Sequence, residues 1–197
     1  MYDAAFPDRR PAGLRRRRVR AGTAWWRLDA GHPSTWEWSG FARPRHRFDP
    51  ATGAFRTRYA ARSAHGAARE RYLDTGWYVP ADHAGHHLVR LVATRSLAVL
   101  DLRTEVNLDA LGVDDRISTS HEPSVWEAAH RLVEAARGWW PDLDGVVYRS
   151  RTTPATSANL AFFSAEGFVI EARPLVECAE VLDDLVVRHR FTVGFTW

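Results

Sequence analysis

The apolar pattern of the sequence mixes helical and strand-like segments without a regular alternation between them. Residues 125–137 and 175–188 repeat apolar side chains at the spacing of an amphipathic helix. Strand-like apolar runs lie at residues 88–93, 97–102 and 145–150. A doubly wound parallel sheet needs strands and helices in strict succession, so this pattern predicts an α+β fold instead. We expect a single domain with mixed or antiparallel sheets flanked by helices.

Short turns separate two pairs of neighbouring strand candidates. Residues 94–96 join the runs on either side of them, and Glu166-Gly167 separates residues 159–163 from residues 168–172. Turns of this length commonly connect adjacent strands, so we expect the second two segments to pair with each other. Residues 191–197 predict a further, terminal strand.

The stretch from residue 47 to residue 76 predicts a turn, a strand and a short helix. Within the strand at residues 55–61, Tyr59 and its alternate neighbours share one face, and Arg56 and Arg58 share the other. Ser63 has the side chain of a helix N-cap and precedes a segment rich in Ala, Arg and Glu. This stretch therefore brings a tyrosine, a glutamate and arginines close together.

The first 22 residues predict a flexible, arginine-rich arm ahead of a folded body at residues 23–197. They hold seven arginines and few apolar side chains. Without the arm the formal net charge falls from +3 to about −2, so the body is not expected to bind nucleic acid. The arm is either a contact for nucleic acid or an acidic partner, or a solvated tail.

Two amino-acid counts exclude several kinds of chemistry. All 27 basic residues are arginine, so the chain has no P-loop lysine, Schiff-base lysine or lysine general base. The single cysteine, Cys178, has no partner for an internal disulfide and fits a reducing compartment. No apolar run approaches the roughly 18 residues of a membrane span, and no secretory signal is evident, so we expect a cytoplasmic protein.

Familiar catalytic signatures are absent from the sequence. It contains neither the glycine-flanked serine of hydrolases, nor a zinc-protease helix motif, nor a dinucleotide-binding glycine motif after a strand. His83, His86 and His87 lie near Asp82 in a glycine-containing loop, a spacing more typical of exposed histidines than of a metal site. We therefore predict no metal.

A series of motifs, taken in order and spacing, resembles the RES domain family, which is named for its Arg, Glu and Ser. The similarity runs from about Ala24 to Ser164. The motifs are Arg27 after two tryptophans, Arg47-Phe48-Asp49-Pro50, Tyr59-Ala60-Ala61-Arg62-Ser63, Ala67-Ala68-Arg69-Glu70, Leu97-Ala98-Val99-Leu100-Asp101-Leu102 and Asp144-Gly145-Val146-Val147-Tyr148-Arg149-Ser150-Arg151. Leu28 is a departure, because a tyrosine is expected directly after the first arginine of the family.

The resemblance implies an ADP-ribosyltransferase-like fold and an enzyme that degrades NAD⁺ by phosphorolysis or hydrolysis. It also implies a toxin that is paired with an Xre-type antitoxin protein, with NAD⁺ as substrate and no metal. By the same resemblance, Glu70, Arg27 and Ser150 are expected to be catalytic, and Arg47 and Tyr59 to bind NAD⁺.

The residue types suit that chemistry. Cleavage of the nicotinamide–ribose bond develops positive charge on the ribose, which the carboxylate of Glu70 can stabilise. Ser150 can orient Glu70 or the ribose, and Tyr59 can stack on or hydrogen-bond to the nicotinamide end. Arginines such as Arg27 and Arg47 can hold the pyrophosphate through bidentate contacts.

Structural roles remain open for every one of these residues. Glu70 can be a surface helix residue, Tyr59 can belong to the core, and Ser150 can cap a turn. Arg27 and Arg47 can be partners in structural ion pairs. Two other functions also remain open: transfer of ADP-ribose to a protein in the same pocket, and non-enzymatic binding through the arm, which we rank last.

Overall fold

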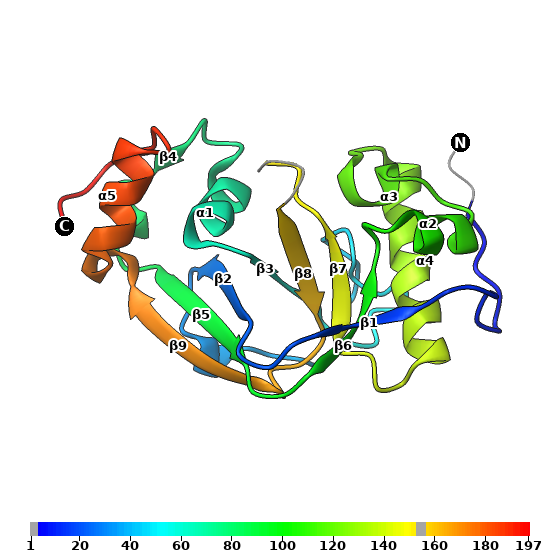
Figure 1. Cartoon of the computed structure of the whole chain (residues 1–197). Helices are drawn as coiled ribbons and strands as arrows, with labels where there is room; N and C mark the ends of the chain where they lie inside the picture. Colours follow the sequence, from blue (N-terminus) through cyan, green and yellow to red (C-terminus); the bar gives the residue numbers. More distant parts are fainter. Residues whose placement is uncertain (1–3, 153–156) are drawn as a thin grey trace.

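An eight-stranded, strongly curved sheet forms the centre of the structure, a computed structural model that describes residues 4–152 and 157–197 (Figure 1). The strands, in chain order, are β1 (Arg16–Val19), β2 (Ala24–Asp29), β3 (Arg58–Ala61), β5 (His87–Ala93), β6 (Leu97–Asp101), β7 (Gly145–Arg149), β8 (Ala158–Phe162) and β9 (Phe168–Pro174). Their order across the sheet is β1-β6-β7-β8-β3-β2-β5-β9. The pair β6–β7 is parallel and the other neighbours are antiparallel, so the predicted α+β fold with a mixed sheet is confirmed.

In the described part of the chain, five α-helices flank the sheet, and a small second sheet lies beside them. The helices are α1 (Ala64–Tyr72), α2 (Glu105–Leu111), α3 (Arg116–Thr119), α4 (Pro123–Trp139) and α5 (Ala179–Val187). The small sheet pairs β4 (Tyr78–Val79) with β10 (Thr192–Val193) in parallel, so only part of the predicted terminal strand is a strand. None of the helices among the described residues has the length and apolar character needed to cross a bilayer.

Local sequence explains where the helix of the central stretch begins and ends. The hydroxyl of Ser63 accepts the backbone N–H of Gly66, so Ser63 is the predicted N-cap of α1. Gly76 follows the helix with a φ of 64°, a left-handed conformation that favours glycine. As a result, α1 leaves directly from the end of β3 and packs back against the sheet.

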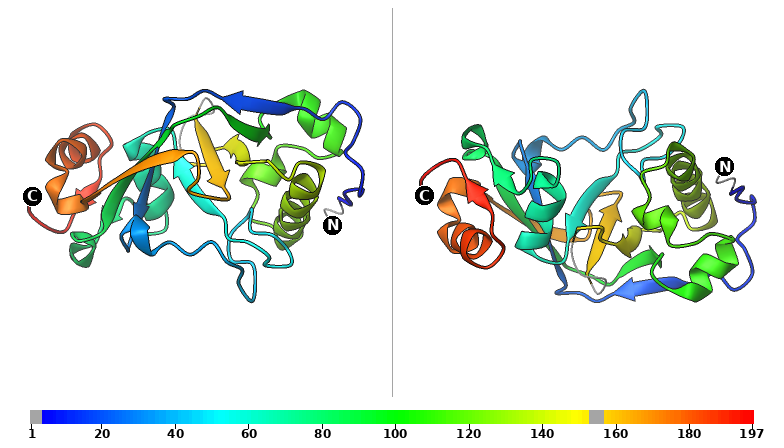
Figure 2. Two further views of the ribbon diagram at one scale, coloured as in Figure 1. Left: turned by 90° about the horizontal axis from the view of Figure 1, so that it is seen from below. Right: turned by 90° about the horizontal axis from the view of Figure 1, so that it is seen from above.

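The sheet consists of two parts that meet at one point. Strands β2, β5 and β9 carry α1 and α5, while β1, β6, β7, β8 and β3 carry α2, α3 and α4 at the other end of the molecule (Figures 1 and 2). Strand β2 pairs with β5 over six residues but with β3 at a single residue pair, Trp26 and Ala61. We call this junction the seam.

Three apolar clusters hold these parts together. The first lies under α4 and includes the fully buried Leu132, the second fills the opposite face of the sheet around Phe162, and the third packs α1 and α5 around Tyr72. Helix α4 has the apolar face that its sequence predicts, since Val125, Leu132 and Val133 are all buried there.

The strand pairing differs from the prediction at the Glu166-Gly167 turn. Residues 159–163 and 168–172 do contribute to β8 and β9, but β8 pairs with β3 and β7, and β9 pairs with β5. Likewise β5 and β6 follow each other along the chain without pairing. Thr94 donates its backbone N–H to the carbonyl of Gly167 at 2.8 Å, so the two turns lie together where the chain crosses between the parts of the sheet.

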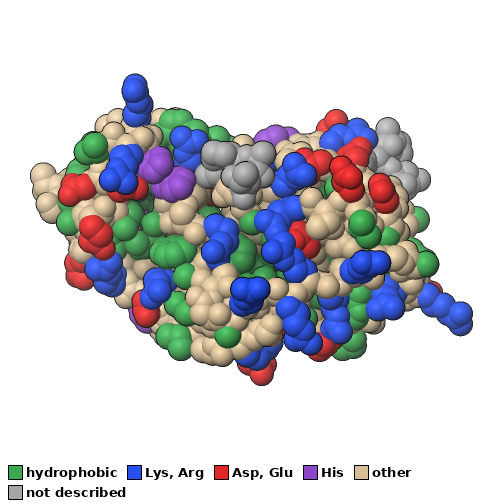
Figure 3. All heavy atoms as spheres, in the orientation of Figure 1, with side chains coloured by type: hydrophobic (Ala, Val, Ile, Leu, Met, Phe, Trp, Pro, Cys, Tyr) green, Lys and Arg blue, Asp and Glu red, His purple; other side chains and the backbone are tan. Residues whose placement is uncertain are grey.

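The structure also differs from the prediction of a flexible arm. Residues 16–19 form β1, an edge strand paired with β6, and Leu14 is buried in the first cluster. Phe6 packs against the same cluster, and the indole of Trp139 donates to the carbonyl of Pro7 at 3.0 Å. These few apolar residues anchor the segment, and arginine side chains then gather on the surface around β1 (Figure 3).

Candidate active site

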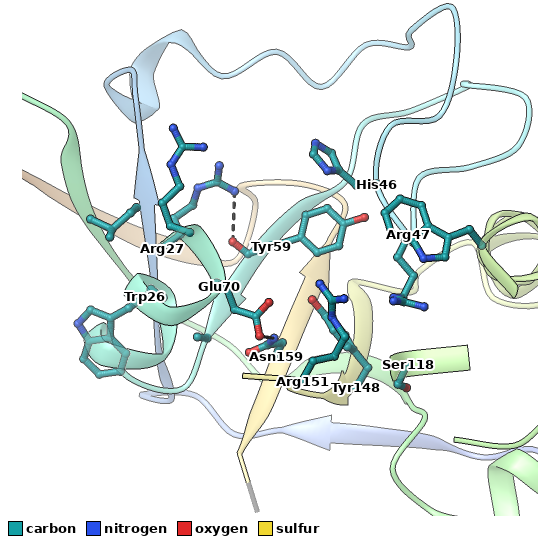
Figure 4. Close-up of a pocket in the computed structure, with 16 residues that line it drawn as sticks. Trp26, Arg27, His46, Arg47, Tyr59, Glu70, Ser118, Tyr148, Arg151 and Asn159 are labelled. Atoms are coloured by element: carbon teal, nitrogen blue, oxygen red, sulfur yellow. Dashed lines mark hydrogen bonds between the residues drawn. The ribbon is translucent and has the colours of Figure 1, made fainter. Parts of the chain in front are cut away.

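A cavity of about 350 Å³ opens at the seam, between α1 on one side and α3 and α4 on the other (Figure 4). We call it the central pocket. Residues from β2, β3, α1, α3, α4, β7 and β8 line it, together with the loops that precede β3 and follow β7. These are Trp26, Arg27, Leu28, His46, Arg47, Tyr59, Ala60, Ala61, Ala67, Glu70, Arg71, Ser118, Trp126, Tyr148, Arg151 and Asn159.

The carboxylate of Glu70 is held by three hydrogen bonds to one of its oxygens. Its Oε1 accepts from Ser150 Oγ at 2.7 Å, from Thr152 Oγ1 at 2.9 Å and from Asn159 Nδ2 at 3.0 Å. The donors are themselves buried, Asn159 being only 2% exposed. Such an arrangement fixes the carboxylate in one orientation, at the wall of the central pocket.

Secondary structure brings these donors to Glu70 from two antiparallel strands. Ser150 and Thr152 follow the end of β7, and Asn159 lies in β8 opposite Tyr148. Glu70 comes from the second turn of α1, on the side that faces the sheet (Figure 4). The predicted closeness of Ser150 and Glu70 is thus present, although Ser150 supports Glu70 from behind and is not among the residues lining the pocket.

Arg27 reaches the edge of the central pocket from β2. One terminal nitrogen donates to the backbone carbonyl of Tyr59 at 3.2 Å, and the other pairs with Asp29 at 2.8 Å. Burial lowers the pKa of Arg27, although the Asp29 carboxylate acts in the opposite direction. The structural ion pair that was left open as an alternative for Arg27 therefore exists, and it holds the arginine at the pocket wall.

Tyr59 lies across the floor of the pocket, and its hydroxyl oxygen accepts the backbone N–H of Phe48 at 2.9 Å. Its ring contacts His46 and Tyr148 edge-on, at centroid distances of 5.6 and 6.5 Å. Burial and the nearby Asp49 raise the pKa of Tyr59 well above its usual value, so the phenol stays protonated. The hydroxyl of Tyr59 thus holds the loop around Phe48, while its side chain also borders the cavity.

Arg47 is buried, with 6% of its surface exposed. Its guanidinium donates to the backbone carbonyls of Ile117 and Ser120 and lies 5.3 Å from the ring centre of Trp126. Burial, followed by the charge of Arg151, lowers its pKa to about 10. The structure therefore gives Arg47 a clear structural task, which is to fasten α3 and the start of α4 to the pocket.

Positive charge dominates the central pocket. Arg27, Arg47, Arg71 and Arg151 line it, against the single carboxylate of Glu70. Tyr148 also faces Glu70, and burial together with that negative charge raises the pKa of its hydroxyl. The pocket therefore combines one fixed carboxylate with a strongly cationic surrounding, which suits a ligand that carries several negative charges and one developing positive centre.

Several pocket residues were not found by sequence reasoning. Asn159 and Thr152 contact Glu70 directly, and Tyr148, Arg71 and Arg151 line the cavity. Asn159 lies opposite Tyr148 because β8 pairs with β7. The sequence predicted instead that β8 pairs with β9, because only a short turn separates these two strands, and so Asn159 was not recognised.

The histidines near Asp82 are held by aromatic contacts. The rings of His83 and His86 stack at 3.8 Å, and His83 Nδ1 lies 3.2 Å from the hydroxyl of Tyr72. Within residues 4–152 and 157–197, no group of three or more His, Cys, Asp or Glu side chains is arranged to hold a metal ion.

Comparisons with known proteins place these observations in a family context. The family model described as "RES domain" matches residues 3–180, most of the chain. Among solved structures, the fold resembles a chain of the M. tuberculosis MbcT–MbcA toxin–antitoxin complex, with a TM-score of 0.57 and 17% identity. That match covers 83% of this chain and 91% of the other. A comparison with curated proteins finds no match.

Proposed function

Since the chain belongs to the RES domain family, we propose that it cleaves the nicotinamide–ribose bond of NAD⁺ in the central pocket. The observation that carries this proposal is the fixed carboxylate: Glu70 Oε1 accepts three hydrogen bonds, in a pocket whose other charged residues are arginines. NAD⁺ matches this charge pattern, because it joins an anionic diphosphate to a ribose that becomes cationic during cleavage.

The reaction requires little chemistry from the protein beyond charge and position. When the C1′–N bond breaks, its electron pair leaves with nicotinamide and neutralises the pyridinium ring, while the ribose acquires oxocarbenium character. Glu70 stabilises this positive charge and can hydrogen-bond a ribose hydroxyl. Water or phosphate then attacks C1′ and gives up a proton. The products are ADP-ribose with water, or its 1″-phosphate ester with phosphate.

Ser150, Thr152 and Asn159 act in this proposal by holding Glu70. Their donors occupy Oε1, so the carboxylate does not need to reorganise as positive charge develops. Tyr59 offers an aromatic edge to the nicotinamide end, and Arg27 contributes positive charge on the diphosphate side. Leu28, which also lines the pocket, provides an apolar contact where a tyrosine was expected.

The test is the release of nicotinamide from NAD⁺ by the purified full chain, with and without inorganic phosphate. Chromatography of the products distinguishes ADP-ribose from its phosphate ester, and radiolabelled NAD⁺ shows whether ADP-ribose is transferred to a protein instead. We expect free nicotinamide from the wild type and from an exposed control variant, Glu171→Gln. Folded protein that releases none under either condition contradicts the proposal.

We further propose that the protein acts as the toxin of a toxin–antitoxin pair, held inactive by an Xre-type partner. The similarity to the solved toxin–antitoxin complex supports this proposal, as does depletion of NAD⁺ as a route to growth arrest. Expression of the chain alone should stop bacterial growth, and Glu70→Gln should relieve the arrest. Arrest that persists with Glu70→Gln would separate toxicity from the pocket.

A further inference from the structure

A second, larger cavity of about 740 Å³ adjoins the central pocket and shares Arg27, His46 and Tyr59 with it. It lies between β3 and the loop at residues 41–49. We call it the arginine cavity, because five arginines line it: Arg27, Arg43, Arg45, Arg56 and Arg58.

Little negative charge offsets these arginines. Of the described residues, only Asp49 brings a carboxylate to the lining of the arginine cavity, and its Oδ2 already accepts the backbone N–H groups of Arg45 and His46, each at 2.9 Å. Outside the cavity, Glu37 lies 3.3 Å from Arg56 and is largely exposed. Asp29 lies 2.8 Å from Arg27 but 3.9 Å from Arg58. The cavity therefore keeps a marked excess of positive charge.

Two tryptophans hold the arginines in place. The guanidinium of Arg58 lies 4.7 Å from the ring centre of Trp36 and 5.4 Å from that of Trp38. Arg27 lies over Trp36 as well, at 5.1 Å. Stacking on aromatic faces fixes planar guanidinium groups and limits the entropy that they lose when an anion binds.

The same arginines retain donors that no described protein group satisfies. The Nε atoms of Arg27, Arg56 and Arg58 are all buried and lack a hydrogen-bond partner among the described residues. Unsatisfied buried donors are costly. The side chains of Arg27, Arg56 and Arg58 nevertheless remain 16%, 38% and 19% exposed, so part of each is open to an anion in the cavity. Burial, followed by the charge of Arg27, also lowers the pKa of Arg58 to about 10, as expected where cations are crowded.

We propose that the arginine cavity binds the diphosphate of a dinucleotide, with the adenosine half beyond it. This inference rests on the proposed NAD⁺ cleavage. In NAD⁺ the diphosphate is attached to the ribose whose C1′ reacts, so it must lie in a cavity that adjoins Glu70. Arg47 is a weaker candidate for that task, because its guanidinium already donates to two backbone carbonyls. The arginine cavity then makes the enzyme select dinucleotides over nicotinamide mononucleotide.

The experiment measures two quantities on the full-length protein: ADP binding by calorimetry, and nicotinamide release from NAD⁺ and from nicotinamide mononucleotide. The variants are Arg58→Gln and the exposed loop double variant Arg43→Gln/Arg45→Gln, which removes charge without disturbing the tryptophan stacking. The control is Arg90→Gln, whose arginine pairs on the surface with Glu171 at 3.0 Å.

We expect each cavity variant to weaken ADP binding about tenfold and to raise the KM for NAD⁺ similarly, as loss of charge-assisted contacts predicts. The activity on nicotinamide mononucleotide should change little, and Arg90→Gln should behave as the wild type. Unaltered ADP binding and an unaltered KM in both variants would overturn the inference and leave the proposed function standing. If ADP binding is weakened in the cavity variants but the wild type releases no nicotinamide, the proposed function is rejected and the inference about the arginine cavity still holds.

Discussion

Phe48 donates its backbone N–H to the hydroxyl oxygen of Tyr59, 11 residues further along the chain, at 2.9 Å. This bond fastens the loop that carries Arg47 to the strand that forms the pocket floor. Removing the hydroxyl in Tyr59→Phe leaves a buried N–H without a partner, so we expect a loss of roughly 1–3 kcal/mol in the free energy of unfolding. Urea denaturation measures it. Full stability with reduced activity would show instead that the hydroxyl serves the substrate.

Glu70→Gln keeps the shape of the side chain and an oxygen that can accept from Ser150, but it removes the negative charge. We expect the fold to persist and the rate of nicotinamide release to fall at least about 100-fold, since the charge opposes the developing cation. Circular dichroism and the thermal midpoint provide the control for folding. A variant that retains most of its activity would remove Glu70 from the mechanism.

Thr152→Val removes one donor to Glu70 Oε1 while preserving the volume of the side chain. The carboxylate is then less firmly positioned, and we expect kcat to fall by about three- to tenfold with KM nearly unchanged. Thr152→Ser restores a hydroxyl and should rescue most of the loss. A change confined to KM would mean that Thr152 contacts the substrate rather than positioning Glu70.

Arg47→Met keeps an aliphatic side chain beside Trp126 but removes the donors to Ile117 and Ser120. We expect this variant to lose roughly 1–3 kcal/mol of stability, because the carbonyl of Ile117 loses its donor and that of Ser120 keeps only the indole N–H of Trp126. ADP binding by the remaining folded protein should be less affected than in Arg58→Gln. The opposite order, with ADP binding lost and stability kept, would return the phosphate-binding role to Arg47.

Acid should destabilise the protein through three partly buried histidines. Burial lowers the pKa of His65, His86 and His130 below the value of 6.5 for a free side chain. The unfolded chain therefore binds protons first as the pH falls through 6.5, and the folded state loses stability toward the lowered pKa values. Urea denaturation at pH 7.5 and pH 5.5 measures this decrease, which His86→Gln should lessen. Equal stability at both pH values would contradict it.

The strands and helices of this fold could be predicted well where the local pattern decides the structure. The helix after Ser63 has its cap, and the helix around Leu132 has its apolar face. The partners of the strands could not be predicted, because a short turn such as residues 94–96 usually joins paired neighbours and here crosses between two parts of the sheet. Likewise, Leu14 and Phe6 are too few to reveal that an arginine-rich segment completes the sheet edge.

In the site, too, residues within sequence motifs could be predicted, whereas residues brought in by strand pairing could not. Family motifs led to Glu70 and Ser150, whose hydrogen bond joins residues 80 positions apart. Asn159 and Thr152 carry no distinctive local pattern, and only the pairing of β7 with β8 brings them to Glu70. Arg56 and Arg58 were predicted to share one strand face, but β3 begins only at Arg58, and the tryptophans that stack on Arg58 come from an irregular loop.

Among the described residues, the single pair of Trp26 and Ala61 joins the strands across the seam. Arg27 stands on one side of it, while Tyr59, Ser150 and Asn159 stand on the other. Helix α1 packs on β2, so the hydrogen bonds of Glu70 to Ser150 and Asn159 connect the two sides. The carboxylate that faces the pocket therefore also ties the two parts of the sheet together where their strand pairing is weakest.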